Sequence, residues 1–160
     1  MLPPPQKKSG FAKEQQPMMK EIQRQRGTAE TMDAIDILKK SAGSRGIDPV
    51  ALNNDLSNMV RNNPDFRIMR ANNSLFPYFN HKDGTVKVYL ETADNPRTLV
   101  DSIQQFAKAM KIAGFKKGQF EIDNPKIIKA IQMAGVPVSV NSTNIPTKTG
   151  QPVMSGVMEF

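Results

Sequence analysis

The sequence predicts a mixed α+β fold, in which a helical hairpin precedes a five-stranded mixed sheet with two further helices, in the order α-α-β-β-β-α-β-α-β. Three observations lead to this prediction. Apolar residues recur at helical spacing over residues 28–62. The period then falls to two, as in strands, between residues 65 and 92. Beyond residue 92, helical segments alternate with short apolar runs up to residue 140.

The helical hairpin is expected from residues 28–42 and from a second segment that follows Asp48. In the first segment the apolar residues form one stripe, and acidic residues precede basic ones, as the helix dipole favours. In the second segment Asp48 is a suitable N-cap and Pro49 a suitable first helical residue. We expect this helix to end at the Asn-Asn-Pro of residues 62–64.

Three strands are expected between residues 66 and 92, paired as an antiparallel meander. Phe66–Arg70 alternates in polarity, and Leu75–Phe79 is a second strand that Pro77 restricts to an edge or a bulge. The clearest strand is Thr85–Thr92, whose apolar face is Val86, Val88 and Leu90 and whose opposite face carries Lys87 and Tyr89.

The Asp-Asn-Pro sequence occurs twice, at residues 94–96 and 123–125, each time before a predicted helix that an Ala-Gly pair ends. The helices are expected over Pro96 to about residue 113 and over Pro125–Ala134, and strands at residues 119–122 and 136–140 follow them. Right-handed crossovers would then let the last three strands run parallel.

The repeated Asp-Asn-Pro has a functional and a structural interpretation. Two helix N-termini at one sheet edge, with Arg97 and Lys126 inside them, could hold a phosphate. Alternatively, Asp or Asn caps each helix and Pro begins it. We favour capping, because no glycine-rich loop is present and an Asp at the cap repels an anion.

The chain divides into three predicted segments. Residues 1–27 are a flexible basic N-terminal arm, rich in Pro, Gln and Lys. Residues 28–140 form a single globular domain, made of the helical hairpin at 28–62 and a sheet domain at 65–140. Residues 141–160 are a polar C-terminal tail or linker.

Composition excludes several kinds of chemistry. The sequence has no cysteine and one histidine, which excludes disulfides, thiolate nucleophiles, Cys-ligated zinc and a His-rich metal site. No apolar run approaches the roughly 20 residues of a membrane span. We expect no cofactor, no metal and a cytoplasmic location in a bacterial or phage-infected cell, with association with a virion as an alternative.

The net charge of +7 favours a polyanionic partner, either nucleic acid or an acidic protein surface. Residues 1–27 carry six basic and two acidic residues, and residues 65–140 carry eleven and seven. The alternative is that these are lysines of a solvated face that complement helix dipoles. The candidates for nonspecific nucleic-acid binding are Arg67, Arg70, Lys87, Tyr89, Lys108, Lys111, Lys116 and Lys117.

Catalytic candidates are few. His81 lies in a predicted hairpin loop, where no nucleophile or carboxylate pair accompanies it. Asp101, Glu121 and Asp123 could form a carboxylate cluster, but capping and surface charge also account for them. The sequence therefore predicts a protein that is not an enzyme.

Residues 84–140 resemble a small accessory domain associated with relaxases and large polyvalent proteins of conjugative elements and phages. The resemblance is in the stretches GTVKVYLET, LVDSIQQFAKAMKIAGF and FEIDNPKIIKAIQMAGVPV. It implies an accessory module of a mobile element or phage, near DNA processing or delivery, and supplies no catalytic residues.

These observations predict a non-enzymatic accessory protein that binds nucleic acid nonspecifically through a basic face and arm. The alternative is a protein–protein adaptor or a structural subunit of a phage virion or secretion assembly. Its segments 1–27 and 141–160 would then become ordered on the partner. A third hypothesis is an inhibitor of a host nucleic-acid enzyme.

Overall fold

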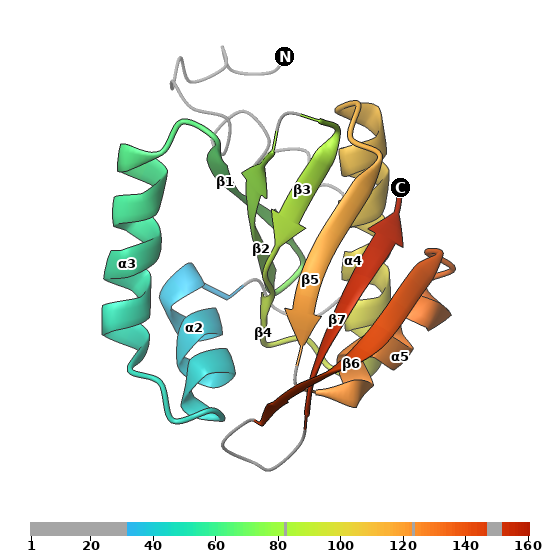
Figure 1. Cartoon of the computed structure of the whole chain (residues 1–160). Coiled ribbons are helices and arrows are strands. Elements are labelled where there is room, and N and C mark those ends of the chain that lie inside the picture. The colour runs from blue at the N-terminus through green and yellow to red at the C-terminus, as the bar shows by residue number, and fades with distance from the viewer. Residues whose placement is uncertain (1–31, 82, 123, 147–151) are drawn as a thin grey trace, which may run out of the picture.

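The computed structural model describes residues 32–81, 83–122, 124–146 and 152–160. In these residues a seven-stranded mixed sheet lies between two pairs of helices, one pair on each face (Figure 1). The predicted α+β class is confirmed, with more strands than the five expected. No helix in the described ranges has the length and apolar character to cross a membrane.

The helical hairpin consists of α2 (Ala34–Gly43) and α3 (Pro49–Asn62). As predicted, the side chain of Asp48 caps α3 by accepting a hydrogen bond from the backbone N–H of Val50 at 3.0 Å. The hairpin packs on one face of the sheet through a small apolar cluster. The buried members of this cluster are Ile37, Leu38, Leu75 and Ala93.

The predicted meander is confirmed by β1 (Phe66–Ala71), β2 (Ser74–Asn80) and β3 (Thr85–Val88), which pair antiparallel in chain order. A two-residue strand, β4 (Glu91–Thr92), continues along β2 after β3. Strands β3 and β4 pair with β2 in the same register, so the chain passes from one to the other without a β-bulge. Pro77 of β2 lies opposite the interruption, where it has no N–H to donate.

The crossover that follows consists of α4 (Pro96–Ile112) and β5 (Lys117–Ile122). As predicted, β5 runs parallel to β3. Helix α5 (Pro125–Met133) then leads to β6 (Val138–Pro146). Together α4 and α5 cover the second face of the sheet.

The C-terminal segment corrects the sequence prediction, because a further strand, β7 (Pro152–Glu159), pairs with both β5 and β6. The tail or linker expected at 141–160 is therefore wrong for residues 141–146 and 152–159. The polar composition is explained by alternation: Met154 and Met158 contact the main core, whereas the alternate residues Ser155 and Val157 face away from it. The predicted arm at 1–27 lies outside the described residues, and the division into a single domain stays a prediction.

The main core lies between the sheet and helices α4 and α5. Phe106 of α4 is fully buried, and its ring stacks on Phe76 of β2 with centroids 4.5 Å apart. On β5 the buried ring of Phe120 lies directly over Gly156 of β7, where a Cβ atom would be 2.3 Å from the ring carbon Cζ. The absence of a side chain at residue 156 therefore sets the position of Phe120.

We predict that Gly156→Ala lowers the free energy of unfolding by about 1–3 kcal/mol, because the added methyl group displaces the buried ring of Phe120. Urea denaturation followed by circular dichroism measures this. Ser155→Ala, one residue away on the same strand, is the matched control and should change it by about 0.5 kcal/mol or less. Equal stability of the Gly156→Ala variant and the native protein would contradict the close packing.

Candidate functional site in a fork of the sheet

The most distinctive feature of the sheet is a fork between two parallel strands. β3 and β5 pair at three positions only, and the last pair is Lys87 with Gln119. Beyond that point β4 remains paired with β2, whereas β5 remains paired with β7 as far as Ile122. The two strands therefore part at their carboxyl ends. In open α/β sheets this is where ligands usually bind.

The inner part of the fork is a small apolar space of about 30 Å³. Strands β3 and β5 form its two sides, and helices α4 and α5 close it on the face of the sheet that they cover. Its apolar lining comprises Phe76, Val88, Leu90, Ile103, Phe106, Phe120, Ile122, Ile127, Ile131 and Met158. We refer to this space and its mouth together as the fork cleft.

The mouth of the fork cleft is larger and more polar, with a volume of about 390 Å³. It shares Tyr89, Leu90, Glu121, Ile122 and Ile127 with the inner part, so the two are continuous. The remaining wall comes from the end of α2 and from the two turns that precede α4 and α5. Large apolar walls with a few polar groups at the opening are typical of small-molecule sites.

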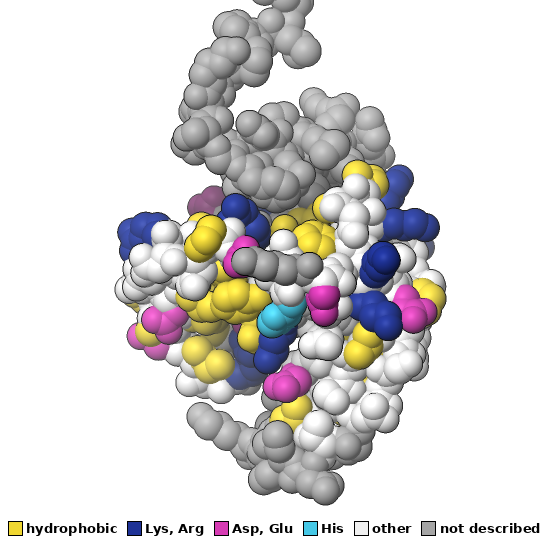
Figure 2. Space-filling view, turned by 45° about the horizontal axis from the view of Figure 1, so that its top comes forward, with side chains coloured by type: hydrophobic (Ala, Val, Ile, Leu, Met, Phe, Trp, Pro, Cys, Tyr) yellow, Lys and Arg dark blue, Asp and Glu magenta, His cyan; other side chains and the backbone are white. Residues whose placement is uncertain are grey.

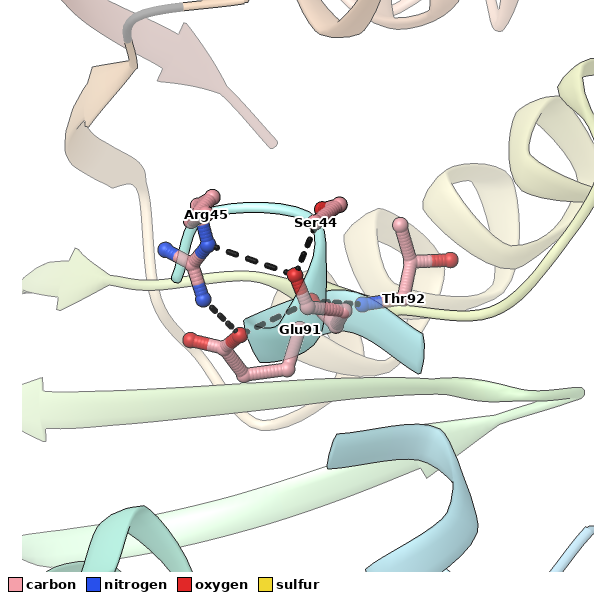
Figure 3. A network of polar contacts seen from close by, with 5 residues as sticks. Ser44, Arg45, Glu91 and Thr92 are labelled. Atoms are coloured by element: carbon pink, nitrogen blue, oxygen red, sulfur yellow. Dashed lines mark hydrogen bonds and ion pairs between the residues drawn. The ribbon is translucent and has the colours of Figure 1, made fainter. Parts of the chain in front are cut away.

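An ion pair lies at the mouth. Glu91 of β4 is 8% exposed, and its carboxylate pairs with Arg45, which follows α2. The carboxylate also accepts a hydrogen bond from the Ser41 hydroxyl at 2.8 Å. Figure 3 shows Arg45 and Glu91 pointing toward each other from these two elements. Burial raises the pKa of Glu91, and Arg45 and Ser41 oppose that rise by stabilising the anion.

Asp94 links the turn before α4 to the rest of the fold. Its Oδ1 accepts a hydrogen bond from the backbone N–H of Asn73 at 3.0 Å. Its Oδ2 accepts from the hydroxyls of Ser74 at 2.5 Å and Ser102 at 2.7 Å. The carboxylate therefore joins the β1–β2 turn, strand β2 and helix α4, and fixes the wall of the cleft mouth.

Asp94 and Asn124, one from each Asp-Asn-Pro sequence, line this mouth, and the Asn of each sequence caps the helix that follows. The side chain of Asn95 accepts from the N–H of Thr98 at 2.9 Å, and that of Asn124 accepts from the N–H of Lys126 at 3.0 Å. Pro96 and Pro125 begin the helices, as expected. The capping interpretation is thus confirmed for both turns; Asp123 lies outside the described residues.

Tyr89 and Glu121 are the two titratable side chains that line both parts of the fork cleft. Tyr89 lies between β3 and β4 and is 42% exposed, with the Nζ atom of Lys87 located 5.9 Å from its ring centroid. Glu121 lies on β5, on the opposite side of the fork, and is exposed. The fork cleft thus has the phenol of Tyr89 on one side and the carboxylate of Glu121 on the other.

The predicted nucleic-acid-binding residues do not form one surface. Arg70 is half-buried, because its guanidinium donates to the backbone oxygens of Met32 and Asn72 and to the side chain of Asn73. Burial lowers the pKa of Arg70. Arg67 is exposed and lies opposite Tyr78, so it projects from the face that α4 covers.

The other predicted basic residues fall into separate places. Lys87 and Tyr89 lie on the face of the sheet that is turned away from the main core, as predicted. Figure 2 shows the Lys and Arg side chains of one face in several separate groups, with Asp and Glu side chains between some of them. The remaining candidates are exposed on α4 and at the start of β5: Lys108, Lys111, Lys116 and Lys117.

The remaining catalytic candidates are also separated. His81 lies in the β2–β3 hairpin, at the end of β3 far from the fork, where its backbone N–H donates to Thr85. Asp101 lies on α4 and accepts from the side chains of Asn72 and Gln105. Of the two described members of the proposed carboxylate cluster, Glu121 lies at the cleft and Asp101 does not. Sequence reasoning missed Glu91 and Asp94, whose partners come from distant segments.

Solved structures with the same fold are GNAT acetyltransferases. The phosphinothricin acetyltransferase of Sinorhizobium meliloti, in complex with acetyl-CoA, is 10% identical, with a TM-score of 0.54 over 83% of this chain and 86% of that chain. The yncA structure from Salmonella typhimurium, with its cofactor acetyl-CoA, is 12% identical, with a TM-score of 0.54 over 83% and 92%.

A GNAT-family structure from Chromobacterium violaceum is 12% identical, with a TM-score of 0.51 over 71% of this chain. The chain spans 64% of the length of that structure. No protein-family model and no curated protein sequence matches the chain. The likeness therefore concerns the fold.

These matches correct four predictions. The resemblance to the accessory domain of relaxases and polyvalent proteins is wrong, because the matched structures are consistently GNAT acetyltransferases. The predictions of a non-enzymatic protein, of nonspecific nucleic-acid binding and of a mobile-element or phage accessory role are wrong for the same reason. The alternative of an adaptor or virion subunit finds no support among them.

We predict that Asp94→Ala lowers the free energy of unfolding by about 2–4 kcal/mol, because it removes the acceptor of three hydrogen bonds that join the β1–β2 turn, β2 and α4. Urea denaturation measures the change. Asp55→Ala, at an exposed site on α3, is the control and should differ from the native protein by about 0.5 kcal/mol. Similar stability of the two variants would exclude the linking role of Asp94.

We predict that Arg45→Met destabilises the protein by about 1–2 kcal/mol at neutral pH, because a buried carboxylate then lacks its counter-ion. The figure is below that of a fully buried pair, since the Arg45 side chain is 39% exposed. A raised folded-state pKa means that Glu91 takes up its proton more readily in the folded protein, so acidification relieves the burial cost.

The loss of stability in Arg45→Met should therefore shrink as the pH falls through the raised pKa of Glu91, which lies above the ordinary value of 4.5. Urea denaturation over this pH range tests the prediction. Arg61→Met on the exposed face of α3 is the matched control. A loss of stability that does not depend on pH would show that the ion pair does not cause it.

Proposed function

We propose that this protein is an acyltransferase that holds an acyl thioester in the fork cleft and transfers the acyl group to an amine. The observation that carries the proposal is the fork itself, in which parallel β3 and β5 part above an apolar space. The fold likeness to acetyltransferase structures supports the same class of reaction.

The shape of the fork cleft suits an extended donor with a short acyl end. Strand edges that part from each other offer N–H and C=O groups to an extended ligand that contains amides, as in peptide recognition by strand addition. The inner space of about 30 Å³ suits an acetyl-sized group, whereas the mouth of about 390 Å³ suits the longer arm of the donor.

The charge of the mouth suits an amine acceptor. Among the described residues that line it, Glu91, Asp94 and Glu121 are acidic, and Lys40 and Arg45 are basic. The excess of one negative charge attracts a primary ammonium group and disfavours an anionic acceptor. Because Arg45 and Glu91 neutralise each other, the net charge of the mouth comes from Asp94, Glu121 and Lys40.

Glu121 and Tyr89 are the groups that we propose for proton transfer. An ammonium group must lose a proton before its nitrogen can attack the thioester carbonyl, and Glu121 accepts that proton. The C–N bond forms as the C–S bond breaks, and the leaving thiolate takes a proton from the Tyr89 hydroxyl. The new amide nitrogen loses its second proton, which restores the Tyr89 hydroxyl, and Glu121 releases its proton to solvent. Glu91 is less suited as the base, because its carboxylate is held by Arg45 and Ser41.

Acetyl-CoA is the compound bound in the Sinorhizobium meliloti and Salmonella typhimurium structures described above. In this chain the fork cleft fits the thioester end of such a donor, but the turns at its mouth do not fit a nucleotide diphosphate. The N–H of Asp94 already donates to the Thr92 hydroxyl, and the N–H of Thr98 donates to the side chain of Asn95. We therefore assign no step to coenzyme A, and the donor is written as a thioester.

The cytoplasmic location stays a prediction from the sequence, as does the absence of a cofactor. Participation of residues 1–27 in a larger assembly is likewise a prediction, since they lie outside the described residues.

We predict that Glu121→Gln lowers kcat for acyl transfer about 100-fold with little change in KM, because the amide cannot accept the proton of the ammonium group. The assay follows thiol release from S-acetylpantetheine with ethanolamine or lysine amide as acceptor. Glu159→Gln on neighbouring β7 is the matched control and should retain native kcat. Equal rates in the two variants would remove Glu121 from the mechanism, and no transfer by the native protein would contradict the proposed function.

A further inference from the structure

We infer that the acyl donor of this protein is a pantetheine-type thioester whose binding does not depend on a nucleotide diphosphate. The inference rests on the proposed function and specifies the donor class. It follows from the described residues of the two segments that join a strand to a helix beside the fork cleft, which are Thr92–Pro96 and Asn124–Pro125.

A diphosphate at the end of a strand is normally held by free backbone N–H groups of a glycine-rich turn and of the helix that follows it. Glycine matters because it lets the phosphate oxygens approach the backbone closely. Neither turn contains a glycine: between Gly84 and the end of α5, glycine occurs at residues 114 and 118 only. Both therefore lack the residue that a diphosphate cradle requires.

Two N–H groups of the first turn, those of Ala93 and Asp94, already have partners. The N–H of Ala93 donates to the carbonyl of Asn73 at 2.9 Å, and that of Asp94 donates to the Thr92 hydroxyl at 3.0 Å. Pro96 has no N–H, and Asn95 holds the N–H of Thr98. A diphosphate would have to displace these bonds.

The charge of the first turn also opposes a diphosphate. The carboxylate of Asp94 is fixed by the N–H of Asn73 and the hydroxyls of Ser74 and Ser102, so it cannot turn away without losing three bonds. A fixed carboxylate beside a diphosphate repels it, in the low-dielectric surroundings of a cleft more strongly than in water.

The second turn and the cations of the mouth do not compensate. Pro125 has no N–H, and the side chain of Asn124 accepts from the N–H of Lys126. The Nζ atom of Lys40 lies 3.5 Å from the carbonyl oxygen of Ala93, and Arg45 is paired with Glu91. The fork cleft thus has an apolar space for a thioester arm. At its mouth, the groups named above are engaged in internal hydrogen bonds and an ion pair, and are not free to bind an anion.

The test compares two donors that share the thioester arm, S-acetylpantetheine and acetyl-CoA, by isothermal titration calorimetry with the full-length protein. We expect dissociation constants equal within about threefold. Tighter binding of acetyl-CoA by tenfold or more, a difference of about 1.4 kcal/mol, would overturn the inference and leave the proposed function intact. Binding of neither donor would overturn the proposed function as well.

A blocking variant tests whether both donors use the fork cleft. Ile127→Trp fills the space between β5 and α5 and should weaken both donors at least tenfold. Val60→Trp, at an exposed site on α3, is the control and should leave both affinities unchanged. Thermal melts establish that each variant is folded. Unchanged binding to a folded Ile127→Trp protein would overturn the inference.

Discussion

The structure depends on one constraint, which is that the parallel pairing of β3 with β5 ends after three residue pairs. Each strand is held on its other side. Strand β4 pairs with β2, and its Glu91 is tied to the end of α2 by Arg45 and Ser41. Strand β5 pairs with β7 along its whole length. Because each strand has a partner elsewhere, the fork remains open, and the side chains of α4 and α5 form its apolar base.

The same constraint decides the role of the segments that border the fork. The turns before α4 and α5 meet at its mouth, which is where an anion cradle would be most effective. In this chain the side chains of Asn95 and Asn124 accept from the first N–H groups of the two helices, and the carboxylate of Asp94 is held by three internal bonds. Internal bonds stabilise the fold at the cost of a ligand site, so the selectivity of the fork cleft rests on its apolar interior and its carboxylates.

Much of the fold could be predicted from the sequence, because it follows from local patterns. Asp48 caps α3 as expected, the alternation from Val86 to Val88 gives a half-buried strand, and the Asp-Asn-Pro turns begin two helices. The C-terminal hairpin could not be predicted in the same way. Its strands are polar on one face, and the hairpin joins the sheet through the pairing of β7 with β5, which is a non-local contact.

The candidate site was harder to predict, since a fork is defined by a pairing that does not form. No periodicity in residues 85–92 or 117–122 signals where two strands will part. Arg70 was expected at the surface because arginine usually lies there, yet three acceptors from the β1–β2 turn and from Met32 hold it half-buried. The importance of Asp94 likewise depends on Asn73, Ser74 and Ser102, which no spacing rule brings together.

The central claim, that the fork is the ligand-binding site, is tested most directly by a titration of the ¹⁵N-labelled protein with S-acetylpantetheine, followed by two-dimensional NMR. The account predicts that the largest amide shifts fall on residues 88–91 and 120–127, on the two sides of the fork, and that α3 is unaffected. Shifts that are absent, or that concentrate on the lysines of α4 and the start of β5, would contradict it.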